Sequence, residues 1–115
     1  TMDAHSSDQP ELEARLARIV EGLQPMCPRR VLLFGSAARG ETDALSDVDV
    51  IVVAERVAPR FLDRIAEAYD LLDPHYGLDI LIYTPEEYAA MIAAGNPLVE
   101  TAEREGRVLY ERPAA

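Results

Sequence analysis

Two stretches of sequence decide the fold: Val-Leu-Leu-Phe-Gly-Ser at residues 31–36, and Ser-Asp-Val-Asp-Val-Ile-Val-Val at residues 46–53. The apolar part of each stretch predicts a buried strand, over 31–34 and over 47–53. The second strand is apolar on both faces, as expected for an inner strand covered by helices on both sides. Gly35 predicts a tight turn directly after the first strand.

Helix and strand signals alternate around these two stretches. Apolar residues recur at helical spacing in four segments, each bounded by proline, glycine or a capping residue. The helices are predicted to begin at Pro10, Pro59, Thr84 and Asn96. Two more strands are predicted over 78–83 and 108–110. The pattern predicts an α/β fold, with a small mixed sheet of three to four strands flanked by helices.

Length and composition indicate one domain. The chain has 115 residues, of which 49% are hydrophobic and 28% charged, enough apolar surface for a core of its own. The polar composition of residues 1–9 predicts a disordered arm, so we expect a single domain over 10–112 and a short tail over 113–115.

The charge balance limits the partners. Asp and Glu number 21 against 11 basic residues, for a formal net charge of -10. This argues against direct nucleic-acid binding, which needs a basic surface. The single cysteine, Cys27, allows no internal disulfide and fits a reducing cytoplasm. No apolar run approaches the roughly 18 residues of a membrane span, so a cytoplasmic protein without membrane contact is expected.

Three aspartates carry the chemical signal. Asp47 and Asp49 alternate along one strand, so they point to the same face, with Cα atoms roughly 6.5 to 7 Å apart. Asp79 lies within an apolar strand, where a carboxylate is costly unless a cation or hydrogen-bond donors compensate it. Three such groups on adjacent strands favour Mg²⁺, which accepts carboxylate and phosphate oxygens. The constellation suggests two-metal phosphoryl chemistry.

The turn after the first strand could hold a phosphate. Gly35 allows close approach to the main chain, and Ser36 offers a hydroxyl beside free backbone N–H groups. By itself, a Gly-Ser pair is more often a structural turn. Arg39 could reach a phosphate or pair with a neighbouring carboxylate, and the sequence leaves both roles open.

Together these motifs resemble the minimal nucleotidyltransferases of the DNA polymerase β-like superfamily. The resemblance rests on Gly-Ser-Ala-Ala-Arg-Gly at 35–40, Ser-Asp-Val-Asp-Val-Ile-Val at 46–52 and Leu-Asp-Ile-Leu-Ile-Tyr at 78–83. It covers roughly residues 12–111 and implies a polymerase β-like nucleotidyltransferase core.

The resemblance also implies roles for individual residues. Asp47 and Asp49 would hold two Mg²⁺ ions, and Asp79 would complete the site and could accept the proton of the attacking hydroxyl. Gly35 and Ser36 would hold the β and γ phosphates of ATP. The hydroxyl would attack the α-phosphorus in line and pyrophosphate would leave, with positioning and charge neutralisation supplying most of the catalysis.

The family resemblance implies a biological role as well. Its members are antitoxins that transfer AMP to a tyrosine of a partner HEPN-type toxin, and an acidic surface would suit a basic RNA-cutting partner. One alternative is transfer to a small molecule, as in aminoglycoside-modifying relatives, with a homo-oligomer building the missing pocket wall. Another is a catalytically idle antitoxin that neutralises its partner by binding alone.

Overall fold

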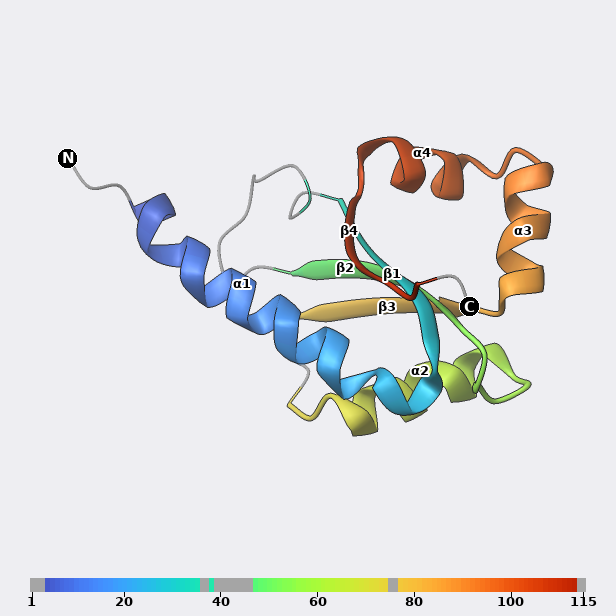
Figure 1. Cartoon of the computed structure of the whole chain (residues 1–115), viewed down its shortest axis with the longest axis horizontal. Helices are drawn as coiled ribbons and strands as arrows, with labels where there is room; N and C mark the ends of the chain where they lie inside the picture. Colours follow the sequence, from blue (N-terminus) through green and yellow to red (C-terminus); the bar gives the residue numbers. More distant parts are fainter. Residues whose placement is uncertain (1–3, 36–37, 39–46, 75–76, 114–115) are drawn as a thin grey trace.

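A computed structural model of the chain describes residues 4–35, 38, 47–74 and 77–113, with residues 4–9 as backbone only. Helices and strands are interspersed along the chain (Figure 1). In order, they are α1 (Ala4–Gly22), a 3-10 turn η1 (Gln24–Met26), β1 (Pro28–Phe34), β2 (Val48–Ala54), α2 (Phe61–Leu71), β3 (Leu78–Tyr83), α3 (Pro85–Ala93), α4 (Pro97–Glu105) and β4 (Arg107–Glu111).

The four strands form one mixed sheet in the order β3-β2-β1-β4. β2 runs parallel to β3, whereas β1 is antiparallel to both β2 and β4. The prediction of a small mixed sheet flanked by helices is therefore confirmed. β3 and β4 are the edge strands, so each has only one neighbour.

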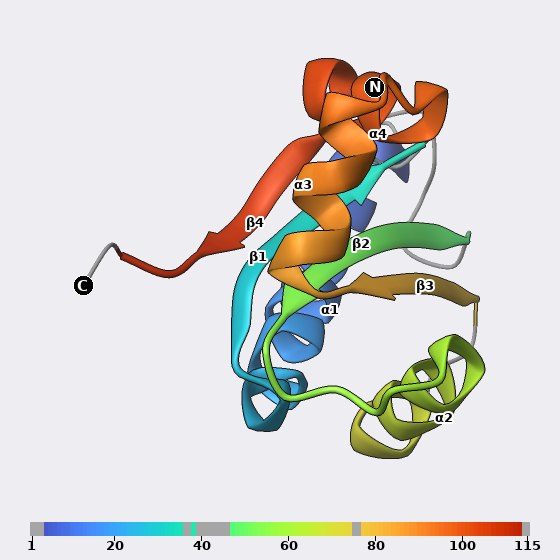
Figure 2. The ribbon, with the colours of Figure 1, turned by 90° about the vertical axis from the view of Figure 1, so that its right-hand side faces the viewer.

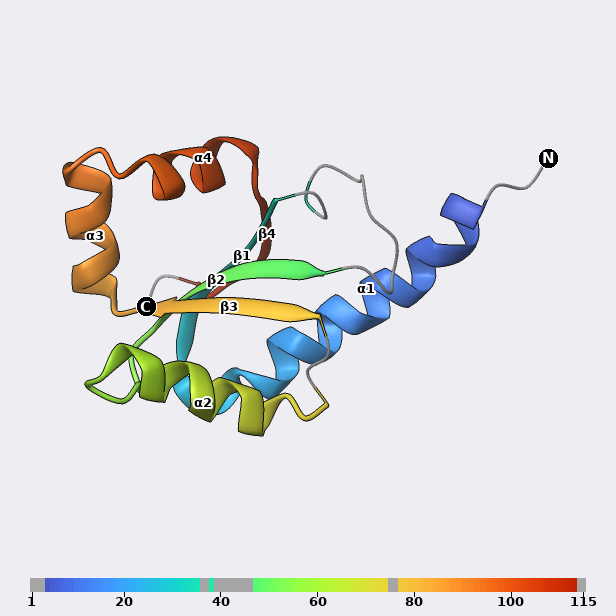
Figure 3. The same cartoon turned by 180° about the vertical axis from the view of Figure 1, so that it is seen from behind.

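Alternate residues of β2 enter two different cores. Val48, Val50 and Val52 belong to the larger core, which α1 and α2 cover. Ile51 and Val53 belong to the smaller core, which contains residues of α3 and α4. Figures 2 and 3 show the two helix pairs on opposite sides of the sheet. This confirms that β2 is an inner strand covered on both faces.

The first helix begins earlier than predicted. α1 starts at Ala4 rather than Pro10, and Pro10 lies inside it. The backbone of residues 4–9 is thus helical where a disordered arm was expected. The polar composition of that segment argues against burial, but it does not exclude helical backbone geometry, because only Pro10 lacks an N–H donor.

β1 also begins earlier than predicted, at Pro28. The added residues include Arg29 and Arg30, which an apolar pattern cannot report. Arg29 pairs with Glu55 and Arg30 pairs with Glu103, so both charges have partners at this end of the sheet.

The predicted starts of α3 and α4 are confirmed. Thr84 Oγ1 accepts the Glu87 N–H at 3.1 Å, and the Glu87 carboxylate accepts the Thr84 N–H at 2.9 Å, which forms a capping box. The side chain of Asn96 accepts the Leu98 N–H at 3.0 Å and caps α4. Gly106 follows the last residue of α4, as predicted.

β4 pairs irregularly with β1. Val31 lies opposite Tyr110, but Leu32 lies opposite Val108, so Leu109 is the extra residue of a β-bulge.

In the part of the chain that the structure describes, none of the helices combines the length and apolarity needed to cross a bilayer.

Candidate active site

Three segments meet at one end of the sheet. The parallel register of β2 and β3 places Asp49 directly opposite Asp79. The antiparallel register of β1 and β2 places Phe34 opposite Asp49, and Gly35 follows immediately. The prediction that these acids lie on neighbouring strands beside the turn is therefore confirmed for Asp49, Asp79 and Gly35.

The face of the sheet that carries Asp49 follows from strand alternation. Val48 and Val50 point into the core beneath α1 and α2, so Asp49 points to the face covered by α3 and α4. Farther along β2, Ile51 on this face is buried, whereas Asp49 is half-buried and Asp79 is exposed. The acidic end of this face is thus accessible to a ligand.

Burial and the neighbouring acids both disfavour the charged form of Asp49. Burial raises the pKa of Asp49, and the negative charge of Asp79, a hydrogen bond with the Asp79 carboxyl group and the charge of Asp47 raise it further. All of these effects disfavour the carboxylate form of Asp49. A bound cation would act in the opposite direction.

Gly35 permits a close approach between the turn and Asp49. Its φ angle is 76°, a left-handed conformation that favours glycine. A Cβ atom at this position would lie 2.7 Å from Asp49 Oδ2, so a side chain would collide with the carboxylate. The Ala38 N–H donates to the Gly35 carbonyl at 3.1 Å, consistent with the predicted tight turn.

The remaining predicted site residues are Asp47, Ser36 and Arg39. Asp47 is exposed and directly precedes β2. Ser36 and Arg39 lie outside the described residues, so their phosphate-binding roles stay predictions.

The acids fit a metal ion that arrives with its nucleotide. Among the described residues, no group of three or more His, Cys, Asp or Glu side chains is arranged to hold a metal by itself. Mg²⁺ takes one or two protein carboxylates and completes its shell with water and phosphate oxygens. The Asp49–Asp79 pair, with its repulsion relieved by a cation, suits that kind of shared coordination.

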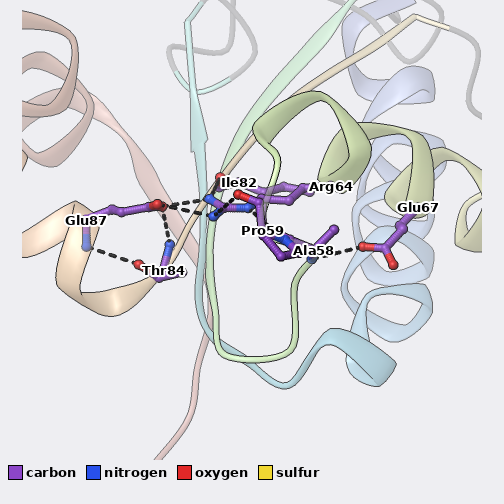
Figure 4. Close-up of polar contacts among 7 residues, drawn as sticks. All are labelled: Ala58, Pro59, Arg64, Glu67, Ile82, Thr84 and Glu87. Atoms are coloured by element: carbon purple, nitrogen blue, oxygen red, sulfur yellow. Dashed lines mark hydrogen bonds and ion pairs between the residues drawn. The ribbon is translucent and has the colours of Figure 1, made fainter.

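A buried arginine, missed by the sequence analysis, anchors the far end of β3 (Figure 4). Arg64 Nη1 donates to Glu87 Oε1 at 2.6 Å and to the Ile82 carbonyl at 3.2 Å. Arg64 also donates to the carbonyl groups of Ala58, at 2.6 Å, and Pro59, at 3.2 Å. The signal in the sequence was an arginine on the same helical face as buried apolar residues.

The ion pair changes the acidity of Glu87. Hydrogen bonds from Arg64, followed by the backbone hydrogen bond from Thr84, lower the pKa of Glu87 to about 2. Glu87 therefore combines the capping of α3 with an ion pair to α2. This network connects two helices to β3 and supports the sheet on which the acids lie.

Tyr69 of α2 packs against the larger core, and its hydroxyl has a further contact. The hydroxyl of Tyr69 donates to the Leu78 carbonyl at 2.7 Å. Burial raises the pKa of Tyr69, and the negative charge of Asp79 raises it further. The contact depends on how α2 packs beside β3, so the sequence alone could not identify it.

With this geometry in place, comparison with known proteins defines the class. The chain belongs to the nucleotidyltransferase domain family, which matches residues 13–110. This match includes both strands that carry the paired aspartates and the turn at Gly35.

One curated relative is similar in sequence. It is a protein of Methanocaldococcus jannaschii named "Putative protein adenylyltransferase", with 31% identity over 85 residues. The aligned part is 71% of this chain and 58% of that protein, so the chain spans little more than half the length of this relative.

Two solved structures are similar in fold. A "putative nucleotidyltransferase" from Sulfolobus solfataricus has a TM-score of 0.65 and 19% identity, covering 97% of this chain and 91% of that one. A chain in the complex of a tri-AMPylated Shewanella oneidensis HEPN toxin with an MNT antitoxin has a TM-score of 0.53 and 20% identity, covering 88% and 73%. At these identities the similarity establishes the shared fold.

Proposed function

We propose that this chain, through a domain at residues 10–112, transfers AMP from ATP to a tyrosine hydroxyl of a HEPN-type partner toxin and so acts as its antitoxin. The observation that carries the proposal is the direct pairing of Asp49 with Asp79 beside Gly35. In a nucleotidyltransferase domain, this is where two carboxylates could share metal ions with a nucleotide triphosphate.

Each residue of the site has a role in the proposed reaction. Asp47, Asp49 and Asp79 would hold two Mg²⁺ ions, which supply positive charge for the triphosphate and the leaving pyrophosphate. The turn at Gly35 and Ser36 would bind the β and γ phosphates, with Arg39 as a further phosphate ligand. Asp79 is the more exposed acid of the pair that faces each other on β2 and β3, and we assign it to receive the proton of the acceptor hydroxyl.

In the proposed transfer, one bond to the α-phosphorus forms and another breaks. The tyrosine oxygen forms a bond to the α-phosphorus, and the bond from that phosphorus to the oxygen bridging the α and β phosphates breaks. The β and γ phosphates leave together as pyrophosphate, and the tyrosine proton passes to the Asp79 carboxylate. The product is AMP joined to tyrosine through a phosphodiester bond.

Two similarities support a protein acceptor. The curated relative is named as a protein adenylyltransferase, and one fold relative belongs to a complex that contains an AMPylated HEPN toxin. The net charge of -10 also suits a basic partner, because opposite charges steer association.

The direct test follows labelled phosphate. The protein is incubated with Mg²⁺, the HEPN-type protein encoded beside it and ATP labelled at either the α or the γ phosphate. We expect α-label on a tyrosine of the partner and no γ-label, with loss of transfer when the chelator EDTA is added. Inhibition of the partner by the Asp49→Asn, Asp79→Asn variant without any mass gain would instead establish neutralisation by binding alone.

A further inference from the structure

We propose that Tyr69 is a positioning residue for this site: its hydroxyl holds the start of β3 so that Asp79 stays beside Asp49. The inference rests on the proposed function, because it assigns a task that matters for metal binding and for the position of the acid at that site. Nothing in the sequence motifs points to this tyrosine.

The hydrogen bond lies directly next to the acid. Tyr69 belongs to α2, and its hydroxyl donates to the carbonyl of Leu78 at 2.7 Å. Leu78 is the first residue of β3 and immediately precedes Asp79. A shift of the Leu78 peptide would therefore move the Asp79 backbone and its carboxylate.

The start of β3 is held from two sides. On the side of β2, the Val48 N–H donates to the Gly77 carbonyl at 2.7 Å. On the other side β3 is an edge strand, and within the described part of the chain no strand pairs with it there. The Tyr69 hydroxyl supplies a hydrogen bond to the next carbonyl, that of Leu78, from a helix instead of a strand.

Repulsion between the acids makes this support necessary. Asp49 and Asp79 are direct partners in the parallel register, so their carboxylates push the two strands apart when both are ionised. β2 is an inner strand with neighbours on both sides, whereas β3 can yield outward. A contact that stops this movement keeps both carboxylates within reach of the same metal ions.

The ring of Tyr69 gives the hydroxyl a defined position. It packs against the larger core, between the sheet and the helices α1 and α2. A packed ring has little rotational freedom, so the O–H group can restrain the strand rather than follow it. Phenylalanine would keep the packing of the ring and remove the hydroxyl.

The test compares Tyr69→Phe with Tyr83→Phe, two variants that each lose one hydroxyl. Tyr83 lies at the other end of β3, where its ring centroid is 5.5 Å from that of Phe61 and 6.3 Å from that of Tyr88. Tyr83→Phe retains these ring contacts, so it controls for the loss of one tyrosine hydroxyl elsewhere in the fold. Thermal unfolding of both variants verifies that they fold.

Two readouts separate positioning from packing. In Tyr69→Phe we expect kcat to fall about tenfold, with the KM for ATP within about twofold of wild type, because the acid is displaced while the nucleotide contacts remain. We also expect Mn²⁺ to bind about fivefold more weakly in the presence of α,β-methylene-ATP, whose α–β bridge is not cleaved. Tyr83→Phe should match wild type in both measurements.

The outcomes distinguish this inference from the proposed function. If Tyr69→Phe is less stable but keeps wild-type kcat and Mn²⁺ affinity, Tyr69 is only a packing residue and the inference is wrong. If the wild type binds Mn²⁺ with the analogue but transfers no AMP, the proposed function fails and the Mn²⁺ comparison decides the inference alone. If the wild type binds no Mn²⁺ under these conditions, both are wrong.

Discussion

The two ends of β3 handle charge in opposite ways. At its start, Asp79 faces Asp49, and each neighbour that acts on the Asp49 carboxyl raises its pKa. Near its end, the buried Arg64 donates to the Ile82 carbonyl and to Glu87, whose pKa falls to about 2. The Arg64 and Glu87 charges thus neutralise each other within the chain. The repulsion between Asp49 and Asp79 would instead be relieved by a bound cation.

The comparison gives opposite expectations for charge removal. Removing a negative charge at the start of β3 relieves repulsion, so the metal-free fold should gain stability while activity is lost. Removing the positive charge near the end leaves carbonyl groups and Glu87 without their donor, so the fold should lose stability.

The largest expected effect belongs to Asp79→Asn. The amide keeps the shape but lacks the charge and basicity of the carboxylate, so AMP transfer should fall by about a thousandfold or more. The melting temperature without Mg²⁺ should rise, because Asp49 loses its negative neighbour. Transfer assays and calorimetry measure the two effects.

Asp70→Asn is the matched control, since Asp70 is an exposed acid on α2. It should leave both activity and melting temperature close to wild type. A clear fall in the melting temperature of Asp79→Asn would contradict the comparison, because it would mean that structural donors stabilise the Asp79 carboxylate.

The second prediction concerns the end of β3 at which Arg64 neutralises Glu87. Arg64→Met should lower the free energy of unfolding by about 3 kcal/mol, because a buried guanidinium that binds three carbonyl groups and a carboxylate is lost. Urea denaturation measures this change. Arg60→Met, at the exposed N-cap of α2, should change it by less than about 0.5 kcal/mol. A similarly small loss for Arg64→Met would show that packing replaces the ion pair.

The third prediction uses the acidity of the two ends. The pKa of Asp49 is raised in the fold, so its contribution to stability is present at low pH and is lost as the pH rises from about 3.8 through the raised pKa. The pKa of Glu87 is lowered to about 2, so its contribution is present above about 4.5 and is lost as the pH falls through 2.

Unfolding free energies between pH 2 and 7 test these opposite slopes. Relative to wild type, Asp49→Asn should gain and Glu87→Gln should lose about 1 kcal/mol near neutral pH. The figure for Glu87 is far below the full linkage value, because its side chain is 45% exposed. If the difference in unfolding free energy from wild type changed in the same direction with pH for both variants, the contrast between the ends of β3 would be wrong.

The smallest expected effect is that of a compensated pair on the surface. Arg107 donates both Nη groups to Glu13, at 2.7 and 2.6 Å, and the hydrogen bond lowers the pKa of Glu13. Both side chains are nearly half exposed, so Glu13→Gln should cost only about 0.5 kcal/mol. A double-mutant cycle with Arg107→Gln, repeated in 1 M NaCl, should give a coupling that salt weakens. A coupling energy as large as the loss expected for Arg64→Met would contradict burial as the reason why the Arg64 ion pair stabilises the fold more than the Arg107–Glu13 pair.

Much of this organisation could be predicted from the sequence, because strand patterns are local. The range of β3 was predicted in full, and the apolar residues on both faces of β2 correctly indicated helices on both sides of the sheet. Asp49 and Asp79 lie on strands as predicted, whereas Asp47 was expected inside the second strand and directly precedes it, because β2 begins at Val48. The register that sets Asp49 directly opposite Asp79 needed the structure.

The features that were missed depend on contacts between distant segments. Arg64 binds carbonyl groups of the turn before α2 and of β3, and no local pattern reports where those groups lie. The bond from Tyr69 to Leu78 likewise depends on the packing of α2 beside the sheet. The helical backbone before Pro10 was missed because a polar stretch gives no helical periodicity of apolar residues to detect.

The bulge in β4 has a consequence for the behaviour of the chain at high concentration. An edge strand offers its free backbone groups to any incoming strand, which is how sheets of separate molecules fuse into aggregates. The extra residue, Leu109, breaks the regular spacing of those groups, and the charged Arg107 and Glu111 stand at the two ends of the strand. An incoming strand would have to match this offset and these charges at once. The irregular edge therefore protects a valine-rich sheet from polymerisation on the side of β4.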